Sequence, residues 1–558
     1  MSLLLLTAVL FAAGIEPDYA TAADFQTEIA APIRAPQERA ERSGGTVKLP
    51  NLTPVINLVA TDGLTQLALA APQDQGEPDA AAEPAAADEP AAPDEEADNE
   101  DAHGKHEVAT WVTVLFGLIL VAMIAALAFE EKIHAKKSLI VGSFAGLCLV
   151  LGTMINLMSF GQVHLPDGHD INLPIYIPAI DWGVITIILG ASLFVEVTSK
   201  SGVFSWLAII LTRRSGGDPW WLLMYYGVLT VVFSAVLNNV TAMIIIGSLT
   251  TVSLRKLSRT DLLLGFLITE GLLTNVGGLL TLISSVPNII VGNAAGISFG
   301  KFFVVAAPYV AVATCVTLLM AKWKFGIKGL KTDEEKQHAK RLVESFDPAE
   351  SVPSKQFFWF SVGALVLFIA CLAGQAYLPL GLNELGMGFV ALFFACGVLW
   401  AYRHEVDRFY AAVDWDLLAF FAALFIVINV MEHAQVLNVL GQAIAGLLAL
   451  PDMIDSSALL VSSAVASSVT DNIPLAAMLA QILGALKTDP ASPFWWAVIF
   501  GANLGGNITP IGSASTVVAM TIINRQKLGL TFVDFVKAAT PFAVVQLILA
   551  IVYLLVFV

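Results

Sequence analysis

The chain has 558 residues, of which 57% are hydrophobic and only 13% are charged, and its mean hydropathy is +0.76. This composition excludes a soluble domain, because apolar runs of about 20 residues, each long enough to span a bilayer, recur from Trp111 to the C-terminus. The formal net charge is −17, but Asp74 to Asp101 holds twelve acids and no base, so most of the acidity belongs to one segment. The sequence therefore predicts an all-α polytopic membrane protein.

The N-terminal region precedes the first predicted span and divides into three parts. Residues 1–22 contain a short apolar run followed by Ala20-Thr-Ala22, which is typical of a signal peptide; the alternative is an uncleaved first helix. Residues 23–71 are predicted to be an extracytoplasmic N-terminal segment. Residues 72–106 form an acidic, Ala/Pro-rich linker with no apolar surface to offset the entropy of ordering, so we expect disorder there.

Basic residues determine the predicted topology of the membrane part. They gather on one side only if 219–256 and 456–487 are re-entrant hairpins, each leaving the membrane on the side from which it entered. The basic side is then cytoplasmic, which predicts a multi-pass protein of the cell (inner) membrane with its acidic N-terminal segment outside. The predicted order is leading transmembrane helices at 107–160, repeat 1 at 181–322, a cytoplasmic loop at 323–355, linking transmembrane helices at 356–402 and repeat 2 at 414–558.

The second half of the membrane part repeats the first. An offset of 233 residues pairs Asp181-Trp182 with Asp414-Trp415 and Asn239 with Asn472, and a shortening changes the offset to 228 for the next segment. There, Asn275-Val-Gly-Gly278 pairs with Asn503-Leu-Gly-Gly506. On the predicted topology the two units enter the membrane from opposite sides. The fold class is therefore two inverted-topology repeats, each with a re-entrant hairpin and a discontinuous transmembrane helix, which in transporters hold ion and substrate sites near the midplane.

Polar residues interrupt each repeat twice, at a hairpin tip and in a broken span. The tips are Ser234–Thr241 and Ser467–Pro474, and the breaks are Asn275–Asn288 and Asn503–Thr516. Unwound carbonyls and side-chain oxygens are hard ligands that suit a dehydrated alkali cation. The candidate ion-binding residues are Asp471, Asn472, Thr470, Asn238, Asn239, Thr241, Glu270, Asn275, Asn503, Asn507, Thr509 and Ser513, of which Asp471, Asn472, Asn239, Asn275, Asn503 and Thr509 are the predicted ligands of Na⁺.

Two acids distinguish the repeats. Asp471 is paired with Asn238, and Glu270, a little before the first break, is paired with Val498. No Lys or Arg lies in a predicted span near the breaks, and acids without a base suit cations. The alternatives remain that Asp471 only caps the second hairpin helix and that Glu270 is a protonated core acid. Glu196 is interpreted as structural.

In the predicted mechanism, a proton and a cation compete for the same carboxylate site. Asp471, helped by Glu270, binds either a proton or a cation: burial favours the protonated carboxyl, whereas a bound cation favours the ionised form. Antiport follows if the ion-free, deprotonated form cannot change its facing.

The interrupted segments resemble those of NhaD-type sodium/proton antiporters of the ion transporter superfamily, over about residues 107–558. The resemblance implies exchange of internal Na⁺ or Li⁺ for external H⁺, a role in pH homeostasis, a homodimer, and no cofactor beyond the transported ions. One departure is Asn238, where such antiporters often carry Asp, so no second tip carboxylate is implied. The motifs are Ser-Ala-Val-Leu-Asn-Asn-Val-Thr241, Thr-Glu-Gly-Leu-Leu-Thr-Asn-Val-Gly-Gly278, Ser-Val-Thr-Asp-Asn472 and Ala-Asn-Leu-Gly-Gly-Asn-Ile-Thr-Pro510.

Other functions of the same superfamily stay open. A sodium-coupled carboxylate carrier would be expected to show Ser-Asn-Thr-like tips, whereas this chain has Asn-Asn-Val240 and Asp-Asn-Ile473. Arsenite efflux is the second alternative. The sequence contains no HExxH and no GxSxG, so we do not predict an enzyme.

Overall fold

The computed structural model describes residues 108–128, 130–157, 161–164, 170–174, 176–375, 384–451 and 454–558. The predicted signal peptide, N-terminal segment and acidic linker lie outside the described residues. The described part is almost entirely helical, which confirms the predicted all-α class. The one addition is an antiparallel pair, β1 (Gly161–His164) and β2 (Asp170–Leu173), in the predicted loop at 161–180.

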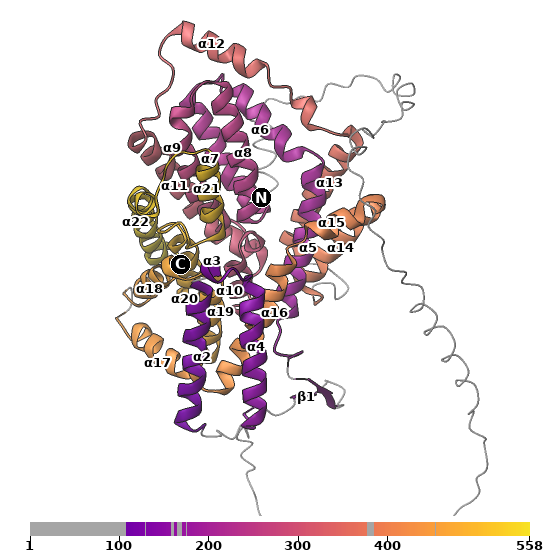
Figure 1. Cartoon of the computed structure of the whole chain (residues 1–558), viewed down its shortest axis with the longest axis vertical. Coiled ribbons are helices and arrows are strands. Elements are labelled where there is room, and N and C mark those ends of the chain that lie inside the picture. The colour runs from indigo at the N-terminus through magenta and orange to yellow at the C-terminus, as the bar shows by residue number, and fades with distance from the viewer. Residues whose placement is uncertain are drawn as a thin grey trace, which may run out of the picture. The chain divides into compact units, whose positions relative to one another are not determined.

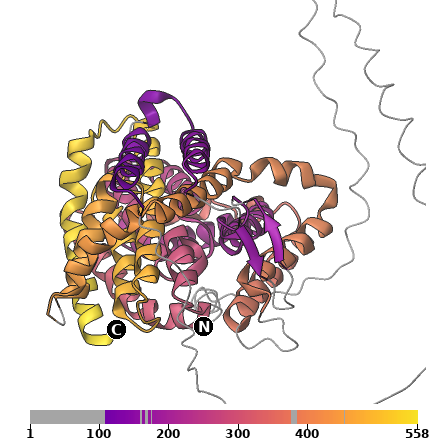
Figure 2. The ribbon, with the colours of Figure 1, turned by 90° about the horizontal axis from the view of Figure 1, so that it is seen from below.

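Two helices precede the first repeat, α2 (Thr110–Ala128) and α4 (Lys137–Met154), with the short α3 (Glu130–Ile133) between them. Figure 2 shows α2 and α4 side by side at the edge of the described part. The helix α4 packs along α16 of the second repeat.

The first repeat contains nine helical elements. They are α5 (Trp182–Lys200), α6 (Val203–Arg214), α7 (Pro219–Val236), α8 (Asn239–Lys256), η1 (Thr260–Leu262), α9 (Leu263–Gly278), η2 (Leu282–Ser284), α10 (Val286–Ala294) and α11 (Phe299–Lys324).

The region that connects the two repeats contains one charged helix, α12, as well as apolar helices. They are α12 (Asp333–Glu344), η3 (Pro348–Ser351), α13 (Lys355–Gly374), α14 (Gly386–Ala401), η5 (Arg403–Glu405) and α15 (Val406–Ala412).

The second repeat follows the same order as the first. It consists of α16 (Trp415–His433), α17 (Val436–Leu448), α18 (Asp455–Val469), α19 (Asn472–Ala485), α20 (Pro493–Gly505), α21 (Ala514–Arg525) and α22 (Phe532–Phe557).

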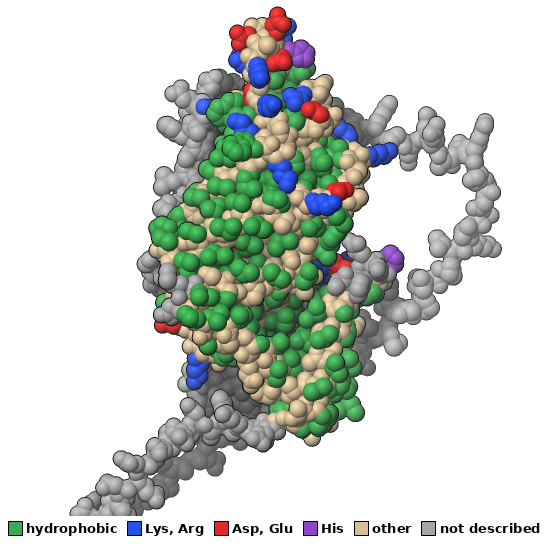
Figure 3. Space-filling model, turned by 90° about the vertical axis from the view of Figure 1, so that its left-hand side faces the viewer, with side chains coloured by type: hydrophobic (Ala, Val, Ile, Leu, Met, Phe, Trp, Pro, Cys, Tyr) green, Lys and Arg blue, Asp and Glu red, His purple; other side chains and the backbone are tan. Residues whose placement is uncertain are grey.

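Eight described helices are long and apolar enough to cross a bilayer, or nine if α14 and the helix after it, bent by 91°, form one span. Figure 3 shows a face covered by hydrophobic side chains, with charged side chains gathered mainly at the end that carries α12. An apolar outer surface of this kind suits contact with lipid.

Equivalent residues make equivalent contacts in the two repeats. The side chain of Asp181 caps α5 by accepting from the Val184 N–H at 3.1 Å, and Asp414 caps α16 by accepting from the Leu417 N–H at 3.0 Å. The indole N–H groups of the next residues, both Trp, donate to carbonyls five residues earlier in each case. Helices α11 and α22 each carry one internal proline. The repeat found in the sequence is therefore also a repeat of local structure.

The two helical hairpins, α7–α8 and α18–α19, open toward opposite ends of the molecule (Figure 1). The open end of the first lies at α12: Asp218 accepts from the Leu330 N–H at 2.7 Å, and Lys256 donates to the Ser345 carbonyl at 3.3 Å. The open end of the second lies at α17, which packs against both of its helices. The inversion of the two repeats relative to the membrane stays a prediction.

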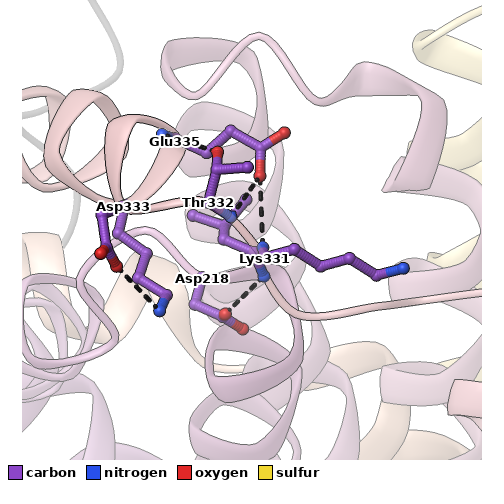
Figure 4. A network of polar contacts seen from close by, with 7 residues as sticks. Asp218, Lys331, Thr332, Asp333 and Glu335 are labelled. Atoms are coloured by element: carbon purple, nitrogen blue, oxygen red, sulfur yellow. Dashed lines mark hydrogen bonds and ion pairs between the residues drawn. The ribbon is translucent and has the colours of Figure 1, made fainter.

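A polar network fixes the segment before α12 to the first hairpin (Figure 4). Asp218 binds the loop at Leu330, and Glu335 accepts from the N–H groups of Lys331 and Thr332, both at 3.2 Å. These hydrogen bonds hold the pKa of Glu335 below its usual range. The predicted cytoplasmic loop is thus docked on the base of the hairpin.

Glycines let each hairpin pack closely on its broken helix. A Cβ atom at Gly277 would lie 2.7 Å from the Cα of Val231, and one at Gly505 would lie 2.3 Å from the carbonyl oxygen of Ala464. These two contacts are equivalent in the repeat. The paired glycines of the breaks therefore bring helix backbones together.

We expect Gly505→Ala to lower the free energy of unfolding by about 1–3 kcal/mol, because the new methyl group meets backbone that cannot rotate away. Thermal unfolding of the purified protein in detergent measures the loss. Gly484→Ala is the matched control, since a Cβ there meets nothing within 4 Å. Equal unfolding temperatures for the two variants would contradict the close packing.

Candidate ion and substrate site

Each hairpin tip ends one helix and starts the next through a capping side chain. Asn238 accepts from the Thr241 N–H at 2.7 Å and so caps α8. Asp471 accepts from the Ile473 N–H at 3.2 Å and so caps α19. Asp471 therefore has the capping role that was the alternative to ion binding, and the neutral Asn238 performs the same role in the first repeat.

Hydroxyl groups tie each tip to its break in the same way. The Ser234 and Ser467 hydroxyls donate to carbonyls of the broken helices, those of Thr274 and Ala502, both at 2.6 Å. In return, the hydroxyls of the breaks donate to the last turns of the first hairpin helices: Thr281 to Ala235 at 2.5 Å and Thr509 to Ser468 at 2.6 Å. The hydroxyl of the candidate ligand Thr509 thus donates its proton to a backbone carbonyl group.

Asn275 is the centre of a buried amide cluster that joins the two repeats. Its side-chain nitrogen donates to Asn507 Oδ1 at 2.8 Å and to Ser513 Oγ at 2.9 Å. Its oxygen accepts from Ser515 at 3.0 Å and from Asn239 at 3.4 Å. The structure therefore brings together four candidate residues, Asn239, Asn275, Asn507 and Ser513.

Asn503 occupies the equivalent position in the second repeat and has different partners. Its oxygen accepts from Ser285 at 2.8 Å, and its nitrogen donates to Asn288 Oδ1 and to the Ile499 carbonyl, at 2.9 and 2.8 Å. Asn503 is fully buried. No hydrogen bond among the described residues links this second cluster to Asn472 or Thr470; the Thr470 hydroxyl donates to the Ala466 carbonyl at 2.8 Å.

Several site residues were missed by the sequence analysis. Ser285, Asn288 and Ser515 lie inside the predicted breaks but were not selected. Gln546 lies in the apolar second half of α22, accepts from Asn507 at 2.8 Å and donates to Thr317 at 2.9 Å. A single amide in such a helix is itself a signal for a buried polar contact.

A base lies beside the second hairpin tip, although no Lys or Arg lies in a predicted span near the breaks. Lys137 Nζ, at the start of α4, lies 2.5 Å from Asp471 Oδ2. Asp471 and Lys137 retain 19% and 34% of their side-chain exposure, and Glu130 Oε1 lies 3.8 Å from the same ammonium. Also on α4, Ser138 donates to Asp416 of α16. The carboxylate of the second tip is therefore held as an ion pair by a helix outside both repeats.

Glu270 lies apart from the tips. It is fully buried in α9, and its Oε1 accepts from the Thr250 hydroxyl of α8 at 2.5 Å. Its Oε2 has no hydrogen-bond partner in the ranges that the structure describes. A charge there would have neither water nor a counter-ion, so a protonated carboxyl group is the less costly form.

A cavity of about 340 Å³ lies between the two tips and helices α5 and α16. Asn472, which is 7% exposed and makes no side-chain hydrogen bond to any described residue, lines it together with the first turns of four helices. Glu196 also lines it and pairs with Lys200 at 3.1 Å, although it was interpreted as structural. Asp471 is not among its lining residues, which include Asn238, Asn239, Thr241, Ser285, Asp414, Asn472, Ser513 and Ser515.

The arrangement offers two kinds of chemistry. Helix N-termini carry partial positive charge and favour anions in the cavity. Carbonyl and amide oxygens at the tips and breaks favour alkali cations. Over the described ranges, no group of three or more His, Cys, Asp or Glu side chains could hold a metal ion.

Hairpins, broken helices and eight or more membrane-length helices define the chain as a multi-pass membrane transporter. Residues 108–501 match the citrate transporter (CitMHS) family model, so the chain belongs to this family of the ion transporter superfamily. The fold is similar to that of the solved YdaH transporter of Alcanivorax borkumensis, with TM-score 0.50 and 16% sequence identity, over 80% of this chain and 98% of that one.

Two relatives show how far the similarity extends. An uncharacterized transporter of Mycobacterium tuberculosis is 30% identical over 385 residues, covering 67% of this chain and 86% of its own length. The human P protein is 27% identical over 527 residues, covering 80% of this chain and 60% of its own length.

We expect Lys137 and Asp471 to be energetically coupled. In a double-mutant cycle with Lys137→Gln and Asp471→Asn, the two losses in unfolding free energy should overlap by about 1 kcal/mol, because solvent partly screens the pair. Thermal unfolding in detergent provides the measurement. The control cycle uses the more exposed pair Arg408 and Glu405, for which coupling near zero is expected. Additive losses at Lys137 and Asp471 would show that the ion pair does not form.

Proposed function

We propose that the chain exchanges Na⁺ or Li⁺ for H⁺ across the membrane, with the cation at Asp471. The observation that supports this most directly is the position of Asp471, the one carboxylate at a described hairpin tip. The Lys137 ammonium and the start of α19 compensate the charge of this carboxylate.

The cation would replace Lys137 beside the carboxylate. Oxygen ligands from Asn472 and from the tip and break carbonyls would complete its coordination, with Asn239, Asn275, Asn503 and Thr509 as further candidates. The resemblance of both tips and both breaks to NhaD-type antiporters favours the same substrates.

The second candidate function is sodium-coupled transport of a small carboxylate. It is favoured by the cavity of about 340 Å³, into which the first turns of α8, α10, α19 and α21 open, and by the unbonded amide of Asn472. The matching family model is described as that of a citrate transporter. The tip triplets, which differ from Ser-Asn-Thr, favour the antiport proposal.

We expect Asp471→Asn to abolish Na⁺-driven proton movement, because a neutral amide keeps the helix cap but cannot balance a bound cation. Acridine-dye dequenching in inverted vesicles measures the proton movement after addition of NaCl or LiCl. Asp407→Asn, at an exposed position on α15, is the matched control and should behave like the unmodified protein. Full exchange in Asp471→Asn would refute the assignment of the cation site.

The same vesicles separate the two candidate functions. Antiport predicts equal dequenching by sodium chloride, sodium succinate and sodium citrate, since the anion takes no part. A response that requires citrate or succinate, accompanied by uptake of the labelled acid, would instead establish the carboxylate carrier.

A further inference from the structure

The transport core contains a second carboxyl group whose surroundings differ from those of Asp471. Glu270 is 0% exposed, forms no ion pair with a described Lys or Arg, and has a hydrogen-bond partner at only one of its two oxygens among the described residues. Asp471 is partly exposed and paired with Lys137. An ion pair favours the charged form, whereas an unpaired buried site favours the neutral form. The two groups are therefore suited to different ions.

Buried hydroxyl groups connect the neighbourhood of Glu270 to one end of the molecule. The hydroxyl of Tyr226, on α7, is 2.5 Å from Thr212 Oγ1 and 2.8 Å from Ser253 Oγ. Ser253 lies on α8 three residues after Thr250, the hydrogen-bond partner of Glu270, so the two hydroxyls share a helix face. All five side chains are buried.

This row of hydroxyl groups ends close to the surface, although Thr212 itself is only 1% exposed. Thr212 lies in the last turn of α6, next to the exposed Arg213 and Arg214, and Ser253 lies in the last two turns of α8. These helix ends belong to the side that the positive charges predict to be cytoplasmic. A hydroxyl can accept a proton on one lone pair while donating its own to the next oxygen, so a row of hydroxyls conducts protons without moving an ion.

We infer that Glu270 is a proton-binding site separate from the cation site at Asp471, supplied from the α12 end of the molecule through Thr212, Tyr226, Ser253 and Thr250. The inference rests on the proposed exchange and assigns the cation to Asp471 and the proton to Glu270. One proton enters at Thr212, and the hydroxyls of Tyr226 and Ser253 each pass one on. Ser253 and Thr250 are not hydrogen-bonded to each other, so the transfer between them requires a rotation of these side chains on their shared face of α8; Thr250 then gives its proton to Glu270 carboxylate, which becomes the acid, and release runs the same steps in reverse.

One helix couples the two sites. Glu270 and Asn275 lie five residues apart on α9, roughly 7.5 Å along its axis at ~1.5 Å per residue. Asn275 contacts Asn239 of the first tip and Ser513 of the second break. A change of charge at Glu270 can therefore alter the geometry of the amide cluster, two members of which, Asn239 and Ser513, line the same cavity as Asn472.

Glu270→Gln separates the two roles, because the amide has nearly the shape of a protonated carboxyl group and cannot release a proton. In proteoliposomes, the variant should lose Na⁺-driven proton movement while keeping exchange of labelled for unlabelled Na⁺. Tyr226→Phe, which removes the central hydroxyl, should slow proton movement severalfold and leave sodium self-exchange unchanged. The matched control is Tyr553→Phe, whose hydroxyl donates to the Val305 carbonyl outside this chain.

Two results would overturn the inference: full Na⁺-driven proton movement in Glu270→Gln, or loss of its sodium self-exchange at an unchanged unfolding temperature. The second result would place Glu270 in the cation site or in a structural role. Failure of the proposed function looks different, because the unmodified protein would then show neither sodium self-exchange nor proton movement, and the inference would fall with it.

Discussion

The structure depends on one constraint, that every backbone group freed by a helix interruption inside an apolar protein needs a hydrogen-bond partner. Two hairpin tips and two breaks free such groups close together. Small hydroxyl side chains satisfy them reciprocally: Ser234 and Ser467 reach from hairpin to break, and Thr281 and Thr509 reach back. The site is therefore built from pairs of elements that fix one another, and each pair needs glycine where their backbones meet.

The two repeats share this framework and differ in what they place on it. Asn275 gathers partners from both repeats, whereas its equivalent, Asn503, is held by Ser285 and Asn288 of the first repeat. The two repeats also differ in their acids: Asp471 of the second repeat corresponds to Asn238, and Glu270 of the first corresponds to Val498. The Ser and Thr hydrogen bonds that join tips to breaks do not involve these acids. The acids of the two repeats could therefore diverge without loss of the fold.

The sequence was sufficient to predict the features that local pattern encodes. Hairpins at 219–256 and 456–487 agree with α7–α8 and α18–α19, because positive charges and polar tips interrupt long apolar runs at those places. The pairing of Lys137 with Asp471 could not be predicted, since 334 residues separate them and nothing near Lys137 distinguishes it from other lysines at a helix end. The docking of Leu330 on Asp218 could not be predicted for the same reason, whereas Gln546 had a local signal as a single amide in an apolar helix.

The surroundings of the two acids bear on how a cation can be selected. Glu130, 3.8 Å from the same ammonium, leaves the group of Asp471, Lys137 and Glu130 with one net negative charge, but attraction at long range does not distinguish one monovalent cation from another. Selection therefore has to occur at contact, where a small dehydrated cation gains several oxygen ligands at once and the single ammonium gives only one or two hydrogen bonds. In the proposed exchange, a cation has to displace Lys137 and so needs several oxygen ligands, and the tip and break oxygens, rather than the charge of Asp471 alone, would discriminate between ions. The amides of Asn239 and Asn472, which face the same cavity as the helix N-termini, are then as important for specificity as the acid itself.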